Sequence, residues 1–410
     1  MNLGKHWNEV LEYDIAGYYA YLPATFIYKD LQFSFYDKIL EEDTSGEEKG
    51  DFRQSSVDDK IVNKYFVGTA ILQLPFFAVA HLVTLATGGE ANGYSYWYIF
   101  FIAISSVLYG LLGLYFLSKI LTSFGLRNST IWIVILSITF GTNFFVYTSI
   151  DPGTSHTYSF ACVNAFIWFF ILFNKSSSRK LFFILALLLG LILLIRPINV
   201  IFLLGLPVFL DSFREVKSLL LKFRKLGIYF ILGCLFSLLI VSIQLLIYKL
   251  QTGSWFLYSY AGESFNFTNP QIFNFLFSFR KGYFLYTPLA MVSILSLYAF
   301  YKYNKFKALS LCVFLIAIVY VFSSWWSWWY GGSFSSRVML EYSLFVFLPL
   351  GFLIQKFSGI KYKLFIGFIV IVTIFSQIQI YQFRHGQIHY ADTSKELYLE
   401  NFMRIDKLLK

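Results

Sequence analysis

The sequence predicts an all-α integral membrane protein with about ten spanning helices. Of its 410 residues, 57% are hydrophobic and only 14% are charged, which is more apolar surface than one soluble core can bury. The apolar residues are grouped in runs close to the roughly 20 residues that a spanning helix needs. Lysines and arginines fall in short clusters between these runs and form no basic face, so the net charge of +10 does not indicate a nucleic-acid partner.

Residues 1–95 are expected to form an outer region ahead of the bundle. A tyrosine-rich tract surrounds Asp14, and an acidic segment at 37–59 lacks apolar periodicity and is expected to be a solvated loop. The apolar run from Phe66 to Thr87 contains glutamine, proline and histidine, which favours a helix lying in the outer membrane interface. An ordinary spanning helix is the alternative for this run.

Residues 96–381 are predicted to form the transmembrane bundle, and 382–410 a short outer tail. The stretch from Leu181 to Leu210 is too long for one helix, and Arg196-Pro197 interrupts it, so it is expected to be a hairpin of two short helices. The other runs that qualify as spans or come close are 96–120, 130–150, 156–173, 226–250, 283–301, 307–324, 340–355 and 363–381.

Clusters of lysine and arginine fall in alternate loops, which the positive-inside rule assigns to the cytoplasm. The remaining loops should then face outward. They contain 151–156, the Arg196-Pro197 turn, 251–282 and the aromatic loop 325–332. The polar residues of most interest are therefore expected on one face.

Asp14 and Asp151 are the acidic residues of greatest interest, because an ionisable side chain at the membrane edge is costly and marks a functional site by default. The alternative is two ordinary loop aspartates at helix ends. An aspartate, nearby cations and many aromatic residues suit a reaction between a lipid-borne phosphate and a polar acceptor, in which a base takes a proton and positive charge stabilises the leaving phosphate. The three cysteines are isolated within apolar runs and indicate neither a disulfide framework nor a metal site.

Four features resemble the GT-C superfamily of polytopic glycosyltransferases. Asp14 lies in the tract YDIAGYYAYLPA, which looks like the acidic motif of that family's first outer loop, and Asp151 with His156 resembles its second acidic motif. Lys64, placed before a juxtamembrane helix, is similar to a lysine that contacts the donor phosphate in some members. The fourth feature is the short hairpin at Arg196, followed late in the chain by Tyr330-Gly331-Gly332 and Arg337.

The resemblance implies a GT-C-like bundle with juxtamembrane helices in its first outer loop. It implies an inverting glycosyltransferase that moves a sugar from a polyprenyl-phosphate donor to a glycan, lipid or protein acceptor. The reaction would take place on the outer face of a bacterial-type plasma membrane. The family has a spanning helix before its first acidic loop, whereas only thirteen residues precede Asp14 here, so a further span is expected upstream. A transporter or a lipid or glycan flippase is the alternative function.

The implied roles can be given residue by residue. Asp14 would be the catalytic base, and Asp151 a second acidic group that orients the acceptor or a metal. Lys64 and Arg337 would bind the donor phosphate, although Arg337 could instead neutralise Glu341 one helical turn away. Whether a divalent cation takes part is left undecided. Further candidates for contact with the substrate are Tyr18, His156, Arg196 and Glu341.

Overall fold

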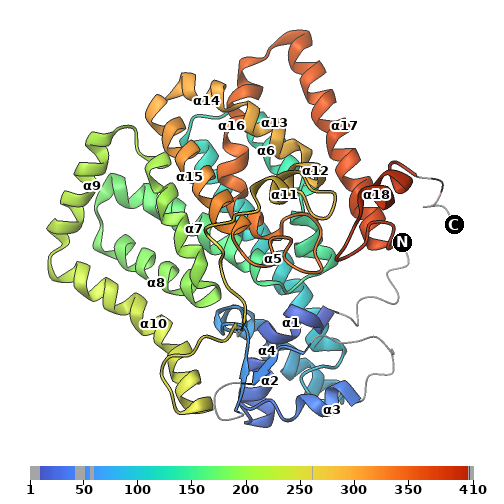
Figure 1. Ribbon diagram of the computed structural model, residues 1–410. Helices are drawn as coiled ribbons and strands as arrows, with labels where there is room; N and C mark the ends of the chain where they lie inside the picture. The colour runs from blue at the N-terminus through green and yellow to red at the C-terminus, as the bar shows by residue number, and fades with distance from the viewer. Residues whose placement is uncertain (1–9, 42–50, 56–59, 261, 405, 407–410) are drawn as a thin grey trace.

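The computed structural model describes residues 10–41, 51–55, 60–260, 262–404 and 406 of the chain. It is a bundle of helices, with one two-stranded antiparallel sheet among the described residues, β1 (Arg53–Ser55) paired with β2 (Ile61–Asn63) (Figure 1). The predicted all-α class is confirmed.

The N-terminal region packs at one end of the bundle (Figure 1). Its helices are α1 (Tyr13–Tyr19), α2 (Tyr21–Pro23), η2 (Ala24–Tyr28), α3 (Tyr36–Glu41) and α4 (Gly68–Ala86). Buried tyrosines and phenylalanines of this region, together with the start of the next helix, form a hydrophobic core of their own. The tract 37–59, predicted to be a solvated loop, lies partly outside the described residues. Of the described part, 37–41 belong to α3 and 53–55 to β1, so the loop prediction is wrong there.

Long helices form the body of the bundle: α5 (Tyr96–Ser123), α6 (Asn128–Gly141), α7 (Ser155–Ser176), α8 (Arg179–Ile195), α10 (Ile228–Thr252), α15 (Lys305–Ser323), α16 (Ser343–Lys356) and α17 (Gly359–Arg384). Shorter elements connect them: η4 (Val146–Ile150), η5 (Pro197–Phe209), α9 (Phe213–Leu226), α11 (Ile272–Phe277), α12 (Tyr283–Tyr286), α13 (Pro288–Leu295), α14 (Leu297–Tyr303), η6 (Arg337–Tyr342) and α18 (Lys395–Asn401). Arg196 is extended, with φ −154° and ψ 108°, and separates α8 from η5 where the break was predicted.

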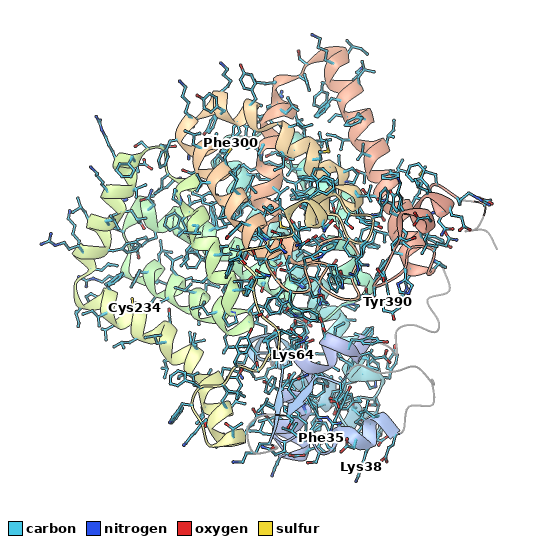
Figure 2. The ribbon with its side chains drawn as sticks, in the orientation of Figure 1. Phe35, Lys38, Lys64, Cys234, Phe300 and Tyr390 are labelled. Carbon is cyan, nitrogen blue, oxygen red and sulfur yellow. The ribbon has the colours of Figure 1, made fainter. Side chains whose placement is uncertain are left out.

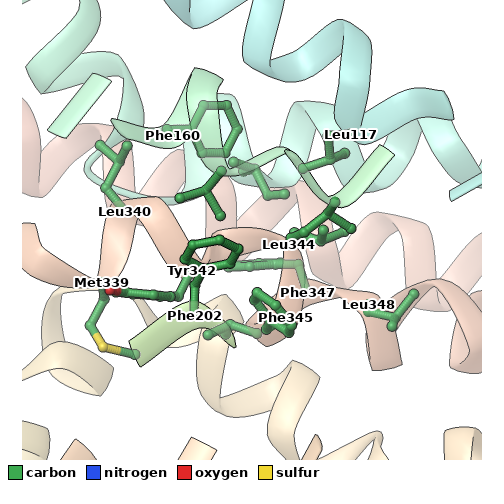
Figure 3. Close-up of a cluster of buried hydrophobic side chains, with 14 of the residues drawn as sticks. Leu117, Phe160, Phe202, Met339, Leu340, Tyr342, Leu344, Phe345, Phe347 and Leu348 are labelled. Carbon is green, nitrogen blue, oxygen red and sulfur yellow. The ribbon is translucent and has the colours of Figure 1, made fainter. Parts of the chain in front are cut away.

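The centre of the bundle is built around α7 and the continuous segment η6–α16. In the most apolar windows of these two segments 83% and 89% of residues are buried, against 22% for α10 and α17, which are therefore peripheral. Figure 3 shows side chains from α5, α7, η5 and η6–α16 meeting in this core, among them Leu117, Phe160, Phe202, Tyr342 and Phe345.

Among the described residues, seven helices are long and apolar enough to cross a membrane, or up to eight if the bent pair η5 and α9 makes one span. The prediction of about ten spanning helices is wrong by this criterion. The run at 283–301 is broken at Thr287 and Ser296 into α12, α13 and α14, each far too short to cross. In the run at 130–150 the α-helix ends at Gly141, and η4 follows as a separate turn.

Helix α4, predicted to be interfacial, meets the same length and hydropathy criterion and is one of the seven. The first turn of α4 packs directly against the end of α8. The two are so close that a Cβ atom at Gly68 would overlap the backbone of Ile195. Gln73 then bonds to Tyr158 in the first turn of α7, at 3.1 Å, and Tyr158 also contacts Ser105 of α5 at 2.5 Å. Most of α4 and the first turns of α5 therefore extend past the ends of α7 and α8.

Candidate functional site

A cavity of about 590 Å³ lies between the N-terminal region and the bundle. Its walls come from α1, the segment before α4, the break between α8 and η5, the connection after α10, and the loop between α15 and η6. Lys64, on the second of these walls, is labelled in Figure 2 between the N-terminal helices and the rest of the molecule. The charged side chains in the lining are Asp14, Lys64, Arg196, Glu263 and Arg337.

Asp14, in the first turn of α1, is held by two partners. Arg337 places Nη2 2.6 Å from its Oδ2, and the Tyr65 hydroxyl donates a hydrogen bond to Oδ1. Burial raises the pKa of Asp14, but Arg337, the Tyr65 hydroxyl and Lys64 outweigh burial and hold the pKa below its ordinary value of 3.8. The carboxylate is therefore ionised at neutral pH.

Arg337 reaches Asp14 because the loop before η6 is fixed at several points. Tyr147 donates to the Phe334 carbonyl and accepts a hydrogen bond from the Phe334 amide, and Asn143 donates to the Ser336 carbonyl. The buried Lys281 ammonium donates to the carbonyl of Ser333 in the same loop. These contacts, from the turn after α6, from η4 and from the segment before α12, set the position from which the guanidinium extends.

Arg196, His156 and Glu341 form a second charged group. Arg196 Nη1 lies 2.9 Å from His156 Nδ1 and 3.6 Å from Glu341 Oε1, and the same Glu341 oxygen is 3.0 Å from His156 Nδ1. Glu341 and His156 are almost fully buried, whereas Arg196 reaches the cavity. The alternative pairing of Arg337 with Glu341 is not the one observed, because Arg337 pairs with Asp14.

Lys64 forms the third ion pair, with Glu263, at an Nζ to Oε1 distance of 2.5 Å. The Lys64 ammonium also lies over the Tyr260 ring, 5.3 Å from its centroid. The three lysine and arginine side chains of the cavity are thus each matched by one carboxylate. Buried charges of opposite sign are usually retained as such pairs, because an unpaired charge is costly to desolvate.

Aromatic side chains make up much of the remaining wall. Trp325, Trp329 and Tyr330 come from the loop after α15, and Tyr258 and Tyr260 from the connection after α10. Tyr330 and Gly331 both have positive φ, of 58° and 64°, which turns this loop back toward the cavity. An aromatic wall of this kind can stack against a sugar ring or an isoprenoid chain.

Asp151 does not share this cavity with Asp14. It follows η4, its side chain is 38% exposed, and its Oδ1 lies 3.6 Å from Nη1 of Arg384 at the end of α17. The structure brings the other predicted site residues together: Asp14, Tyr18, Lys64, His156, Arg196 and Arg337 line the cavity, and Glu341 supports it from behind.

Sequence reasoning missed Glu263 and Tyr65, the partners of Lys64 and Asp14. Glu263 had a usable signal, since it is the one acidic residue in the predicted outer connection 251–282. Tyr65 had none, because tyrosine is abundant throughout the chain.

Metal binding was left open by the sequence. Within the residues described by the structure, no group of three or more His, Cys, Asp or Glu side chains is arranged to hold a metal ion. The acidic residues of the cavity are instead paired with lysine or arginine.

Comparison of the chain with protein-family models, with curated proteins and with solved structures finds no match. The residues of the cavity are therefore the evidence for what it can do chemically.

Proposed function

We propose that the protein is a glycosyltransferase of the GT-C type, which transfers a sugar from a polyprenyl-phosphate donor to a glycan, lipid or protein acceptor with inversion. The observation that carries this proposal is one cavity in which an ionised aspartate, three cationic side chains and an aromatic wall face the same space. These are the groups that such a transfer needs.

In the proposed reaction the acceptor hydroxyl attacks the anomeric carbon of the sugar, and the bond from that carbon to the phosphate oxygen breaks. Asp14 takes the proton of the hydroxyl, and polyprenyl phosphate leaves with the electron pair. Arg337, with Lys64 and Arg196, stabilises the negative charge that develops on the phosphate. Asp151 lies outside the cavity and receives no role in this step.

The proposed setting is the outer face of a bacterial-type plasma membrane. The basic loops predicted to be cytoplasmic include those near Lys175 and Lys356, at the ends of α7 and α16 away from the cavity. Helix α4 begins beside the end of α8 and extends past the ends of α7 and α8. This arrangement supports an outer, interfacial position for α4.

The proposal is tested with purified protein in liposomes that contain a labelled polyprenyl-phosphate sugar and a membrane extract as the source of acceptor. The wild-type protein should release polyprenyl phosphate and label the acceptor. Asp14→Asn should lose about 10²- to 10⁴-fold in rate, the usual cost of removing a general base. Asp211→Asn is the matched control, because Asp211 is exposed, pairs with Lys307 and does not line the cavity.

Turnover of Asp14→Asn at the wild-type rate would remove the assigned base. A flippase would instead carry the intact donor across the liposome membrane without releasing polyprenyl phosphate, and the same assay distinguishes that result.

A further inference from the structure

The three cations of the cavity differ in how firmly their counterions are held. Asp14 is bound by Arg337 and by Tyr65, and Glu341 is 1% exposed and contacts both Arg196 and His156. Glu263 has the fewest partners of the three carboxylates, since its one ion pair among the described residues is with Lys64. We infer that Glu263 is a displaceable counterion of Lys64, which leaves when a lipid phosphate enters the cavity; this rests on the proposed function.

The contacts of the three carboxylates separate Glu263 from the other two, because Asp14 also accepts a hydrogen bond from Tyr65, and Glu341 is almost fully buried against His156. The side chains of Lys64 and Glu263 are 22% and 20% exposed, so the Glu263 carboxylate has water within reach. Among the described residues its carboxylate has one ion pair, the one to Lys64. Glu263 also lies in a connection between elements, whereas Asp14 and Glu341 lie in helical turns. Moving Glu263 into water breaks its contact with Lys64, whereas moving Asp14, which is 26% exposed, also breaks the hydrogen bond from Tyr65. Moving Glu341 would remove a fully buried carboxylate from both Arg196 and His156.

Lys64 is held in place by contacts that do not involve Glu263. Its ammonium lies 5.3 Å from the centroid of the Tyr260 ring and 6.0 Å from that of Tyr65, and aromatic faces attract cations at this range. Its backbone carbonyl accepts a hydrogen bond from Ser259 Oγ at 2.8 Å. The ammonium thus stays on the cavity wall after Glu263 leaves and can bind another anion.

The exchange has a consequence for affinity. A phosphate that enters must compete with Glu263 for Lys64, so the carboxylate lowers the affinity of the cavity for anions. In the empty cavity, Glu263 also neutralises the Lys64 ammonium, which would otherwise be an unpaired charge. Neutralising Glu263 should tighten phosphate binding, and the gain should depend on Lys64. A purely structural ion pair predicts the opposite, because breaking it would loosen the wall and weaken binding.

The test measures the affinity of the purified full-length protein for farnesyl phosphate, a soluble single-chain lipid phosphate, in neutral detergent. Glu263→Gln should bind it about two- to fivefold more tightly than wild type, the range expected for loss of a partly exposed ion pair. In Lys64→Met and in the double variant Lys64→Met/Glu263→Gln, the affinities should be equal. Glu90→Gln, at an exposed glutamate beyond α4, is the control and should match wild type.

Two further ligands identify what is recognised. Inorganic phosphate should show the same gain in Glu263→Gln, because the exchange involves the phosphate group; binding without a gain would overturn the inference. Farnesol carries no charge, so an equal gain with farnesol would show that the effect is not electrostatic and would overturn the inference.

An unchanged affinity for farnesyl phosphate in Glu263→Gln, or a gain that persists without Lys64, would overturn the inference and leave the proposed function intact. Absence of farnesyl phosphate binding by every variant would instead contradict the anion site itself, and with it the proposed function.

Discussion

Asp14 is surrounded by groups that favour its charged form, which bears on its proposed role as a base. A general base works best when its pKa lies near the operating pH, and Asp14 has a pKa below its ordinary value. Arg337 is the chief cause of the lowering. A donor phosphate that draws Arg337 toward itself would raise the proton affinity of Asp14, and so the carboxylate would become a better base when the donor is bound.

Tyr65→Phe isolates the second contribution to this environment. The hydroxyl donates to the Asp14 carboxylate and stabilises its charge, so its removal should raise the pKa of Asp14. The acidic limb of the pH–rate profile for sugar transfer should move to higher pH, while the retained ring keeps the fold. The profile is measured from pH 3 to 8 beside that of Tyr36→Phe, a buried tyrosine of α3 outside the cavity lining. Coincident acidic limbs in wild type and Tyr65→Phe would count against Asp14 as the base.

Lys281 provides a test of stability against pH. Burial, with Arg280 and Arg337 nearby, lowers the pKa of Lys281 from 10.5 to about 7. Between these values the unfolded chain binds the proton and the folded chain does not, so stability should rise as pH increases from 7 toward 10.5. The slope is at most about 1.4 kcal/mol per pH unit. Below about pH 7, lysine is protonated in both states and adds no slope.

The measurement compares thermal unfolding of wild type and Lys281→Met in detergent from pH 6 to 9.5. Methionine at position 281 has no proton to lose, so this variant lacks the pH dependence. It also loses the hydrogen bonds to the carbonyls of Ser333 and Tyr390, so it should be less stable than wild type at every pH. The gap should widen above pH 7. A constant gap would mean that Lys281 stays protonated in the folded protein.

At the scale of the elements, α1 owes its place beside Tyr65 to Gly17. A Cβ at this position would lie 2.7 Å from Cβ of Phe52 and would clash with the Tyr65 ring. Gly17→Ala should therefore push Tyr65 away from Asp14, cost about 1 to 3 kcal/mol of stability as overpacking does, and reduce sugar transfer.

Gly367→Ala is the matched control for this prediction. Gly367 lies in α17 with open space around it, and alanine favours a helix by up to about 1 kcal/mol over glycine. Thermal unfolding and transfer rate are measured for both variants. Equal behaviour of the two alanine variants would show that the close approach of α1 to Tyr65 does not matter.

The sequence was sufficient to predict those elements that are determined by neighbouring residues in the chain. Proline after Arg196 marked the break between α8 and η5, and apolar runs marked the long helices. It was not sufficient for 283–301, because an apolar run has the same composition whether or not its helix is interrupted. Pairings were also out of reach: Lys64 and Glu263 are 199 residues apart, and which acid meets which cation is decided by tertiary packing.

At the scale of the whole molecule, the cavity lies where two hydrophobic cores meet. Asp14 and Lys64 come from the N-terminal region, and Arg196 and Arg337 from the bundle. The ion pairs Asp14–Arg337 and Lys64–Glu263 therefore join the two parts of the chain across the site. A substrate that breaks either pair also changes how these parts are held together.

The direction of the helices leads to a prediction about topology. Ser105 of α5 contacts Tyr158 of α7, and Phe116 contacts Phe169, so the two helices run in the same direction. The chain must return between them, and the ends of α5 and α7 lie on one side. The positive-inside rule predicts that this side is cytoplasmic, because Lys119, Arg127 and Lys175 lie near these ends.

Single cysteines placed in a variant without Cys162, Cys234 and Cys312 test this arrangement. A cysteine at Ser177, after α7, or at Ser358, before α17, should react with a membrane-impermeant thiol reagent only after the cells are opened. A cysteine at Thr268, exposed in the connection that lines the cavity, should react in intact cells. Labelling of Ser177→Cys in intact cells would reverse the orientation of α7. Reaction of Thr268→Cys only after the cells are opened would rule out a cavity at the outer face.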